Sequence, residues 1–556
     1  MVTNDLKLLV IPLGGFGEIG KNIMAIRYMD DIIVIDCGLM FPEDEMLGID
    51  VVIPDISYLV ENKKLVKGII LTHGHEDHIG AIPYLLDSLN VPIYGTSLTL
   101  GLLEAKLEEN LVKVKAELHL VNAGQKITLG AFVVEFLQVN HSIPDSVGLV
   151  IKTPLGTIVH TGDFKIDQTP VNGDEMMIHR FAELGSQDVL LLMSDSINSE
   201  KTGFTPSERT VGSALERVFS RALEDRIIIA TFASNLHRLQ QIIDTSEKFN
   251  RKLLVLSHKV QSVIDTATKL NKLRLPEKIM ISSEEAKSLP KKKIAVITAG
   301  SQGEPMSVLT KLAFTQHKQL EISTGDTVII SASTIPGNEK VISRTIDSLF
   351  KLGAKVVYDS TSAVHVSGHA SQEELKIMLN LVKPKYFLPI HGEFRHLVKH
   401  KKIAEEIGLK AEQIFVMENG QVLEISKEKA VVAGRVQAGK ILVDGLGIGD
   451  VGNIVLRDRR QLSQDGIFIV VVTISKESGL VVAGPDMVSR GFVYVRESEK
   501  LMEEAKEKVA HALEQCQEKH LSEWSAIKSS VREVLGKFLY EKTRRRPMIM
   551  PIIMEV

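Results

Sequence analysis

The sequence predicts an α/β protein of several domains, with a parallel sheet in an inserted middle domain and a small α+β domain at its end. Its 556 residues exceed what one hydrophobic core usually organises, so the chain should divide into domains. Unbroken apolar strands alternate with helical stretches through the middle of the chain, which is typical of a parallel sheet covered on both faces. A composition of 44% apolar and 24% charged residues is that of an ordinary globular protein.

The first part of the chain carries short β-rich runs that end in Gly/Asp turns. One helix is predicted over residues 79–89, because its apolar residues recur at helical spacing and Pro83 lies early enough to be tolerated. Strands are predicted over residues 7–12, 32–35, 68–71, 132–139, 147–152, 157–161 and 189–193.

The chain changes character near Thr205-Pro206-Ser207-Glu208, which has the composition of a helix N-cap. We interpret residues 207–360 as an inserted α/β domain, with strands at 227–232, 253–256, 294–298, 328–331 and 355–358. After Gly439, short strands, helices around 503–518 and 525–539, and a last strand over 548–554 predict the small α+β domain.

Composition excludes several classes of protein. The apolar runs fall far short of the roughly 20 residues that cross a bilayer and no signal-peptide pattern opens the chain, so we expect a cytoplasmic protein without a membrane span. The only cysteines are Cys37 and Cys516, which excludes a disulfide framework and a multi-cysteine zinc site. Any bound metal must therefore use His and carboxylate ligands. A formal net charge of −4 gives no general attraction to nucleic acid and by itself favours a small-molecule substrate.

The strongest local signal is the segment His73-Gly74-His75-Glu76-Asp77-His78, which lies between a predicted strand and a predicted helix. Alternate residues of a tight turn can direct His73 and His75 at one ion. Asp77 and His78, at the entrance to the helix, would then face a second ion about 3.5–4 Å away.

The same arrangement recurs later in the chain, because three further strands each end in a potential ligand. These ligands are His141 after residues 132–139, Asp163 after residues 157–162, and His391 after residues 386–390. Chemistry in open sheets gathers beyond the strand ends, so we expect these side chains to share one site.

These residues carry a resemblance to the metallo-β-lactamase hydrolases, and the long segment between Asp195 and His391 resembles the β-CASP insertion of nucleases. The whole chain resembles the bacterial ribonuclease J family. The resemblance implies a metallo-β-lactamase αββα sandwich with an inserted, doubly wound parallel-sheet β-CASP domain and a small α+β C-terminal domain. The implied boundaries are residues 1–206 and 361–430 for the two parts of the metallo-β-lactamase domain, 207–360 for the β-CASP domain, 431–450 for a linker and 451–556 for the C-terminal domain.

The resemblance also implies a complete set of metal ligands. One ion would be held by His73, His75 and His141 and the other by Asp77, His78 and His391, with Asp163 bridging the two. Two such cations would lower the pKa of a shared water toward about 7. A mixed His/Asp set fits two Zn²⁺ ions, although Mn²⁺ or Mg²⁺ in catalysis stays open.

Three marker residues of the β-CASP insertion are matched by Asp195, His369 and His391, and a His at the third marker resembles the RNA-cutting branch. Asp77, Asp195 and His369 would be catalytic. His369 would hydrogen-bond the scissile phosphate or protonate the leaving 3′ oxygen, a role suited to imidazole. Asp195 would orient the site, or could be no more than the cap of a strand end.

A donor-rich phosphate pocket is expected at the domain boundary. In ribonuclease J relatives such a pocket holds the 5′-monophosphate of single-stranded RNA. This sequence departs from the commoner pattern at Ala370-Ser371, where Gly-Gly or Gly-Ser would be expected, and an added Cβ narrows the allowed backbone. The expected pocket residues are Ser234, Asn235, Ser331, His365, Val366, Ser367, Gly368 and His369.

The resemblance implies a ribonuclease with 5′-to-3′ exonuclease and endonuclease activity in mRNA decay and rRNA maturation. The alternative is a weakly active or regulatory subunit that scaffolds a catalytic paralogue. We further expect a homodimer or homotetramer, hetero-oligomers with a paralogue, RNA-degradation partners, and a structural Ca²⁺ at Asp50 and Asp444, two residues that also fit ordinary turns.

Overall fold

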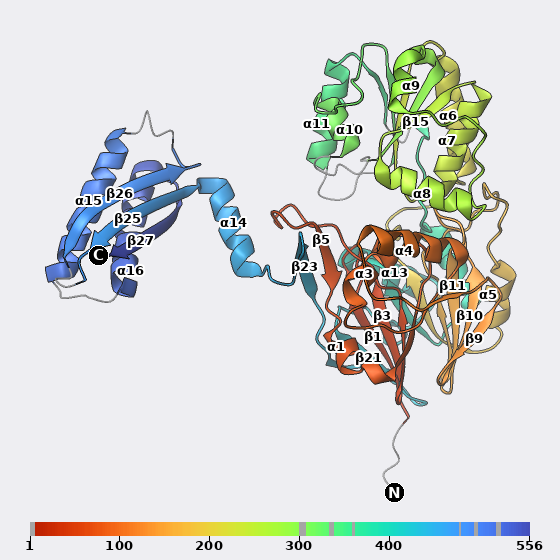
Figure 1. Ribbon diagram of the computed structural model, residues 1–556. Helices are drawn as coiled ribbons and strands as arrows, with labels where there is room; N and C mark the ends of the chain where they lie inside the picture. Colours follow the sequence, from red (N-terminus) through yellow and green to blue (C-terminus); the bar gives the residue numbers. More distant parts are fainter. Residues whose placement is uncertain are drawn as a thin grey trace, which may run out of the picture. The chain divides into compact units, whose positions relative to one another are not determined.

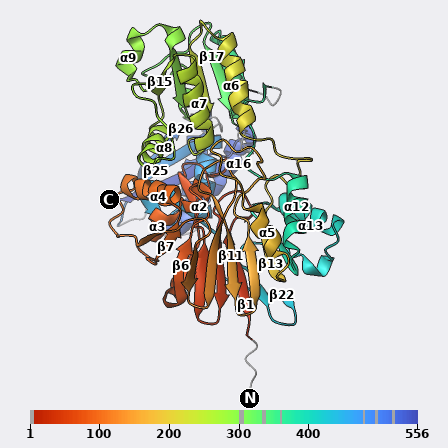
Figure 2. The same cartoon turned by 90° about the vertical axis from the view of Figure 1, so that its right-hand side faces the viewer.

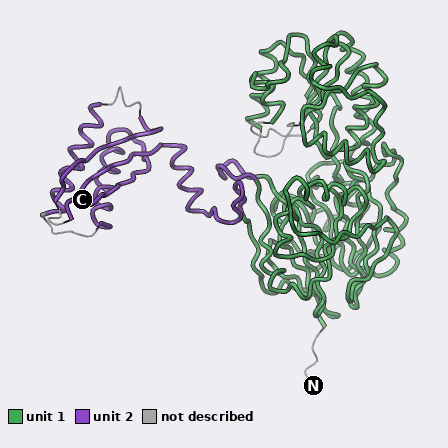
Figure 3. Tube along the Cα trace, viewed as in Figure 1, with its two compact units in different colours: residues 1–41, 51–441 green, residues 42–50, 442–556 purple. Residues whose placement is uncertain are grey.

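The computed structural model describes residues 6–299, 307–332, 339–358, 362–476, 480–493, 499–518 and 524–556. The chain forms two compact units, one of Met1–Phe41 and Val51–Ile441 and the other of Pro42–Asp50 and Leu442–Val556 (Figure 3). Among the helices in these described ranges, none has the length and apolar character that a membrane crossing requires.

Two sheets packed face to face form the body of the first unit (Figures 1 and 2). Their shared core buries Ile26 and Ile33 from one sheet against Phe136 and Leu191 from the other. The eight-stranded sheet has the order β22 (Ala430–Arg435), β21 (Gln421–Ile425), β1 (Leu8–Gly14), β3 (Ile23–Tyr28), β4 (Asp31–Ile35), β6 (Val66–Ile70), β7 (Ile93–Gly95), β8 (Leu118–Leu120). The six-stranded sheet has the order β19 (Tyr386–Ile390), β13 (Val189–Asp195), β12 (Gly156–His160), β11 (Val147–Thr153), β10 (Phe132–Gln138), β9 (Lys126–Leu129).

Helices cover the outer faces of both sheets. Phe181, Leu375 and Ile403 bring α5 (Ile178–Leu184), α12 (Gln372–Val382) and α13 (Phe394–Glu406) into the core behind the six-stranded sheet. On the other side, Leu59 of α1 (Ser57–Glu61) and Ile82 of α3 (Ile82–Leu85) line the face of the eight-stranded sheet, and α4 (Ser97–Glu109) follows β7. The predicted αββα sandwich is confirmed.

The helix predicted over residues 79–89 is two short helices in the structure, α2 (Glu76–Ile79) and α3. Pro83 lies in the first turn of α3 and has no N–H to donate back to the carbonyl of Ile79. The chain therefore leaves the helical path between Ile79 and Ile82 and starts again.

A five-stranded sheet, all parallel, forms the inserted domain in the order β15 (Lys252–Val255), β16 (Ile294–Thr298), β14 (Ile227–Thr231), β17 (Thr327–Ser331), β18 (Lys355–Val357). One face packs on α6 (Arg209–Arg221), α7 (Leu236–Lys248) and α8 (His258–Lys269), and the other on α9 (Ser283–Ser288), α10 (Val308–Ala313) and α11 (Glu339–Lys351). Strands β14 and β17 are neighbours with Thr231 opposite Ser331, so their carboxyl ends open at the same edge. The doubly wound domain predicted from the sequence is confirmed.

The second unit contains a three-stranded sheet of β26 (Val481–Arg490), β25 (Ile467–Ile474) and β27 (Met548–Glu555). Every second residue of β25 is buried beneath α15 (Glu499–Glu518) and α16 (Trp524–Thr543), as the small α+β domain requires. Helix α14 (Asn453–Asp465) precedes this sheet. The segment predicted as a linker, residues 431–450, forms strands in the structure, because the chain folds back after β21 and Val432 pairs with Leu423.

Candidate metal centre

The turn after β6 brings four potential ligands to the edge of the sandwich. Backbone hydrogen bonds hold it, because Cys37 N donates to His78 O over 2.7 Å and Asn22 N donates to Asp77 O over 3.0 Å. Gly38 lies so close that a Cβ there would collide with the carbonyl of Asp77. Backbone contacts with the distant residues Asn22, Cys37 and Gly38 therefore hold this turn in place independently of its ligand side chains.

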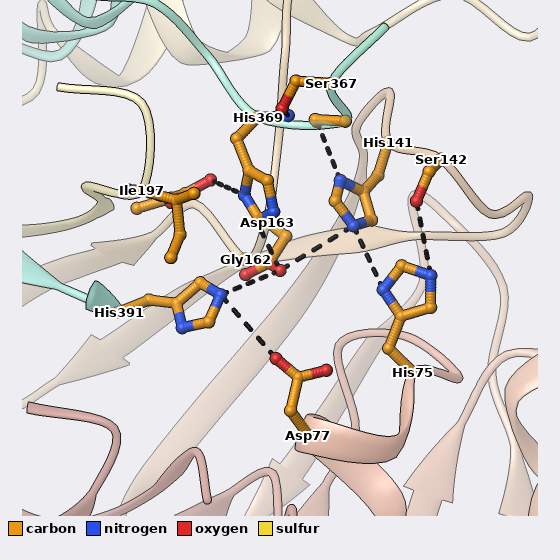
Figure 4. Close-up of polar contacts among 12 residues, drawn as sticks. His75, Asp77, His141, Ser142, Gly162, Asp163, Ile197, Ser367, His369 and His391 are labelled. Carbon is orange, nitrogen blue, oxygen red and sulfur yellow. Dashed lines mark hydrogen bonds and ion pairs between the residues drawn. The ribbon is translucent and has the colours of Figure 1, made fainter. Parts of the chain in front are cut away.

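The first group of ligand atoms combines that turn with the ends of β10 and β12 (Figure 4). His75 Nδ1 lies 3.2 Å from His141 Nε2, as Figure 4 shows. His73 Nε2 lies 3.0 Å from the same His75 Nδ1. Asp163 Oδ2 is 3.7 Å from both His73 Nε2 and His141 Nε2. These four atoms are within 4.8 Å of one another.

The second group shares the same carboxylate. Asp163 Oδ2 lies 3.4 Å from His78 Nε2 and 3.3 Å from His391 Nε2. Asp77 Oδ2 completes it at 3.5 Å from His78 Nε2 and 3.8 Å from His391 Nε2 (Figure 4). One oxygen atom of Asp163 thus belongs to both clusters, and all seven residues predicted from the sequence converge.

These clusters fit divalent cations. Ring nitrogens that face each other over 3.0 Å and 3.2 Å repel through their lone pairs unless a proton or a cation lies between them. A tetrahedral ion with Zn–N bonds of about 2.0–2.1 Å would hold two ligand nitrogens roughly 3.3 Å apart. The donors are imidazole nitrogens and carboxylate oxygens, the set that suits a borderline ion.

The first cluster is already in its metal-binding protonation state. Burial lowers the pKa of His75 to about 4 and the pKa values of His73 and His141 well below their ordinary range. All three imidazoles are therefore neutral near pH 7. His141 Nδ1 donates to Gly368 O over 2.8 Å, so its Nε2 lone pair is the one directed into the cluster.

The second cluster holds protons that a cation would replace. Burial alone would lower the pKa of His391, but nearby carboxylates, Asp163 foremost, raise it to about 9. The pKa of His78 also rises well above its ordinary value against the effect of burial, because Asp163 and Asp77 lie beside it. Binding of a metal here must release protons, which couples affinity to pH.

Asp36 supports this cluster and was missed by the sequence analysis. Its Oδ2 lies 2.8 Å from His78 Nδ1, and its Oδ1 accepts from Thr72 N over 2.8 Å. A carboxylate on the far nitrogen of a ligating imidazole fixes the ring's orientation. Asp36 directly follows β4, so the signal that identified Asp163 and His391 could have identified it too.

Asp195 and His369 lie beside the second cluster. His369 Nδ1 is 2.7 Å from Asp195 Oδ2, while Asp195 Oδ1 accepts from Ile197 N over 3.0 Å. The buried carboxylate thus holds the Nδ1–H form of His369 and leaves its Nε2 free to act. Asn198 Nδ2 and Thr205 Oγ1 both donate to the carbonyl of His369, at 2.9 Å and 2.7 Å, and fix its backbone.

The predicted pocket residues lie at the carboxyl edge of the parallel sheet and on the segment that returns from it. Asn235 caps α7 by accepting from Arg238 N over 3.0 Å, after Ser234. Ser331 is fully buried and its Oγ donates to Val364 O over 2.6 Å, so its proton is already engaged. Ser367 Oγ accepts from Asn198 Nδ2 over 2.8 Å and keeps its own proton to donate.

The departure at Ala370-Ser371 has a structural explanation. Ala370 is buried in the apolar core behind the six-stranded sheet, so its methyl group points away from the donors. Ser371 caps α12 together with Glu374, and its hydroxyl lies 2.8 Å from Thr205 Oγ1. The Cβ atom of Ala370 is accommodated by core packing, and that of Ser371 by its position at the helix cap.

The two aspartates expected at a calcium site lie near each other in the second unit. Asp50 Oδ2 accepts from Gly445 N over 2.8 Å, and Asp444 forms an ion pair with Arg459. Within the described ranges, the clusters of three or more His and carboxylate ligands are those around His73, Asp77 and His369. The calcium site stays a prediction.

Models of known protein families match successive segments of the chain. The model of the metallo-β-lactamase superfamily matches residues 17–218, and that of the ribonuclease J β-CASP domain matches residues 224–349. The zinc-dependent metallo-hydrolase RNA specificity domain matches residues 353–417, and the ribonuclease J C-terminal domain matches residues 454–556. Ribonuclease J2 of Bacillus subtilis (strain 168) is 50% identical over 553 residues, which cover 100% of this chain and 99% of the relative. The chain belongs to the ribonuclease J family.

Other ribonuclease J relatives are similar over almost the same length. Ribonuclease J 1 of Streptococcus pyogenes serotype M3 is 43% identical over 98% of this chain and 97% of its own, and ribonuclease J 2 of Staphylococcus epidermidis is 41% identical over 98% of each. A crystal structure of a protein of unknown function from Enterococcus faecalis V583 shares the fold, with a TM-score of 0.55 and 18% identity over 75% of this chain and 100% of that one.

The predicted family, fold class and enzyme class are therefore confirmed. The chain is a ribonuclease J family hydrolase that contains a zinc-dependent metallo-hydrolase RNA specificity domain, and its His and Asp side chains form clusters that fit metal ions. An RNA specificity domain lies over the segment that carries His369 and His391.

Proposed function

We propose that this ribonuclease J is itself an active nuclease that degrades single-stranded RNA from a 5′-monophosphate end and also cuts internally. The observation that carries this proposal is the complete ligand set, two clusters joined through Asp163 Oδ2. A regulatory subunit has no need of seven converging ligands. We propose mRNA decay and rRNA maturation in the cytoplasm as its setting.

Two divalent ions would be held by His73, His75 and His141 on one side and by Asp77, His78 and His391 on the other. Such a pair supplies a water of lowered pKa and neutralises charge on the phosphate as the phosphorus is attacked. Zn²⁺ suits the donor set, and Mn²⁺ or Mg²⁺ are the other ions to compare in catalysis.

The chain's own residues then manage the proton and the leaving group. Asp195 accepts the Nδ1–H of His369, so the imidazolium form, with its second proton on Nε2, is the one that can hydrogen-bond a phosphate oxygen or give a proton to the departing 3′ oxygen. Cleavage in this sense leaves a 3′-hydroxyl on one product and a 5′-phosphate on the other. The new 5′-phosphate is the end that the pocket takes next.

The pocket is proposed to place the 5′-monophosphate at a fixed distance from the metal clusters. Ser367 contributes a free hydroxyl proton, and Asn235 keeps its Nδ2 for a ligand because its oxygen is used in capping α7. His365 adds a neutral N–H, since burial lowers its pKa to about 3. Ser331, whose proton goes to Val364 O, shapes the pocket from behind.

The test is a cleavage assay on the purified full-length protein with 5′-labelled RNA and added Zn²⁺ or Mn²⁺. We expect faster 5′-to-3′ removal of nucleotides from 5′-monophosphate RNA than from 5′-triphosphate RNA. Asp77→Ala and His369→Ala should abolish cleavage of both. Equal exonucleolytic rates on the two ends would reject the pocket, and an inactive protein with both ions bound would favour a regulatory subunit that scaffolds a catalytic paralogue.

A further inference from the structure

Arg238 is a completely buried arginine at the boundary of the inserted domain, and neither the sequence motifs nor the metal centre explains it. It lies in the first turn of α7. Its Nε and Nη2 pair with the two carboxylate oxygens of Glu208, each at 2.8 Å, and Gln241 also donates to that carboxylate. The bidentate pair satisfies both buried charges, so the side chain has one defined position.

The remaining nitrogen of Arg238 points at the phosphate pocket. Nη1 donates to Ser331 O over 2.7 Å and to Ser331 Oγ over 3.2 Å, and it lies 2.9 Å from His365 Nδ1. Nη2 also reaches Val366 O at 3.4 Å. One guanidinium therefore joins the end of β17, the start of α7 and the segment that carries His365.

This contact decides where the proton of His365 lies. A guanidinium has only donors, so His365 Nδ1 must accept, and the ring proton is on Nε2. Burial first, and then the positive charges of Arg238, Lys201 and Lys165, lower the pKa of His365 to about 3. Glu208, the carboxylate that Arg238 contacts, is already engaged by Arg238 through both of its oxygens.

We propose that Arg238 is a positioning residue for the 5′-phosphate pocket, which holds His365 as a neutral imidazole whose Nε2–H is the donor to a terminal phosphate. This inference rests on the proposed function of the pocket. It goes further by naming the residue that sets the tautomer and by predicting a donor of constant charge.

The decisive variant is Arg238→Lys. A lysine keeps one positive charge for Glu208, but a single ammonium group cannot also reach His365 and both atoms of Ser331. We expect KM for 5′-monophosphorylated RNA to rise about tenfold at pH 8, the loss of roughly one hydrogen bond that involves a charged group, while kcat changes less than threefold. Thermal unfolding checks that the variant is folded.

A double variant separates positioning from a merely structural role. His365→Ala removes the imidazole through which Arg238 is proposed to act, so adding Arg238→Lys to it should raise KM by less than about twofold further. Two independent contributions to binding would instead multiply. Arg251→Lys is the matched control, because Arg251 is 3% exposed and donates to Ala222 O and Asp225 O at the other end of the parallel sheet.

The outcomes distinguish the two proposals. If native enzyme shows no preference for 5′-monophosphate over 5′-hydroxyl RNA, both the pocket and the role of Arg238 are wrong. If the preference exists but Arg238→Lys behaves as Arg251→Lys does, only the positioning role is wrong. A rise in KM of about tenfold when Arg238→Lys is added to His365→Ala would likewise overturn it.

Discussion

Replacing Gly368 by alanine should disturb the first metal cluster although no ligand residue is substituted. A Cβ at this position would lie 2.7 Å from His141 Cε1, 2.8 Å from His141 Nδ1 and 3.1 Å from Ser142 Cβ. Ordinary carbon contacts begin near 3.4 Å, so the ring must recede by about 0.7 Å, the difference between 3.4 and 2.7. The hydrogen bond from His141 to Gly368 O would be distorted by the same movement.

The expected loss follows from how sharply catalysis depends on position. A misplacement of about 1 Å costs on the order of 100-fold, so we expect kcat of Gly368→Ala to fall roughly 10- to 100-fold. Overpacking should lower the free energy of unfolding by about 1–3 kcal/mol. The assay combines kcat on 5′-labelled RNA, metal content of the purified protein and thermal unfolding.

Gly439→Ala is the matched control, because a Cβ there meets nothing within 4 Å and the backbone is not in the left-handed region. It should retain native kcat and metal content. A folded Gly368→Ala protein with full metal content and kcat within threefold of the native enzyme would refute the steric argument.

Three further predictions concern the groups around the clusters. Asp195→Asn should lower kcat by about 10²- to 10⁴-fold with little change in KM, because His369 loses the carboxylate that fixes its tautomer, and unchanged single-turnover rates would contradict this. Asp36→Asn should weaken metal binding by about 10- to 100-fold in competition with a chelator, because the ring of His78 is no longer held; native affinity would show that Asp36 does not orient it. In metal-free protein, the raised pKa of His391 contributes stability that is fully present below its unfolded value of 6.5 and is lost as pH rises through about 9. Thermal unfolding between pH 6 and 9.5 should show this loss with chelator present, and an equal loss in metal-loaded protein would count against it.

The metal clusters could be predicted because each ligand has a recognisable pattern in the sequence around it. His141, Asp163 and His391 each come shortly after a predicted strand, and strands of one sandwich end at a common edge. Asp36 carries the same signal, but a single aspartate after a strand is also the usual sign of a turn. Asp36 can be told from an ordinary turn residue only when the structure shows His78 beside it.

Arg238 could not be predicted in the same way. In the sequence, Arg238 lies at the start of a helix among both polar and apolar residues, where a charged side chain is normally exposed to solvent. Its burial depends on Glu208, thirty positions earlier, and on the return of the chain at His365. Which distant charged residues pair is decided by how whole helices and strands pack together. Local sequence patterns do not contain that information.

The order of the strands has a consequence for synthesis. The first cluster needs no residue beyond Asp163, whereas His391 follows β19, which joins the sheet beside β13 only after the inserted domain. The 227 residues between positions 163 and 391 take about 10 to 45 seconds to translate at roughly 5–20 residues per second. During that interval a nascent chain could bind the first ion but would still lack His391, a ligand of the second ion. The ribosome that synthesises this nuclease is therefore not exposed to a complete active site until the inserted domain has been translated.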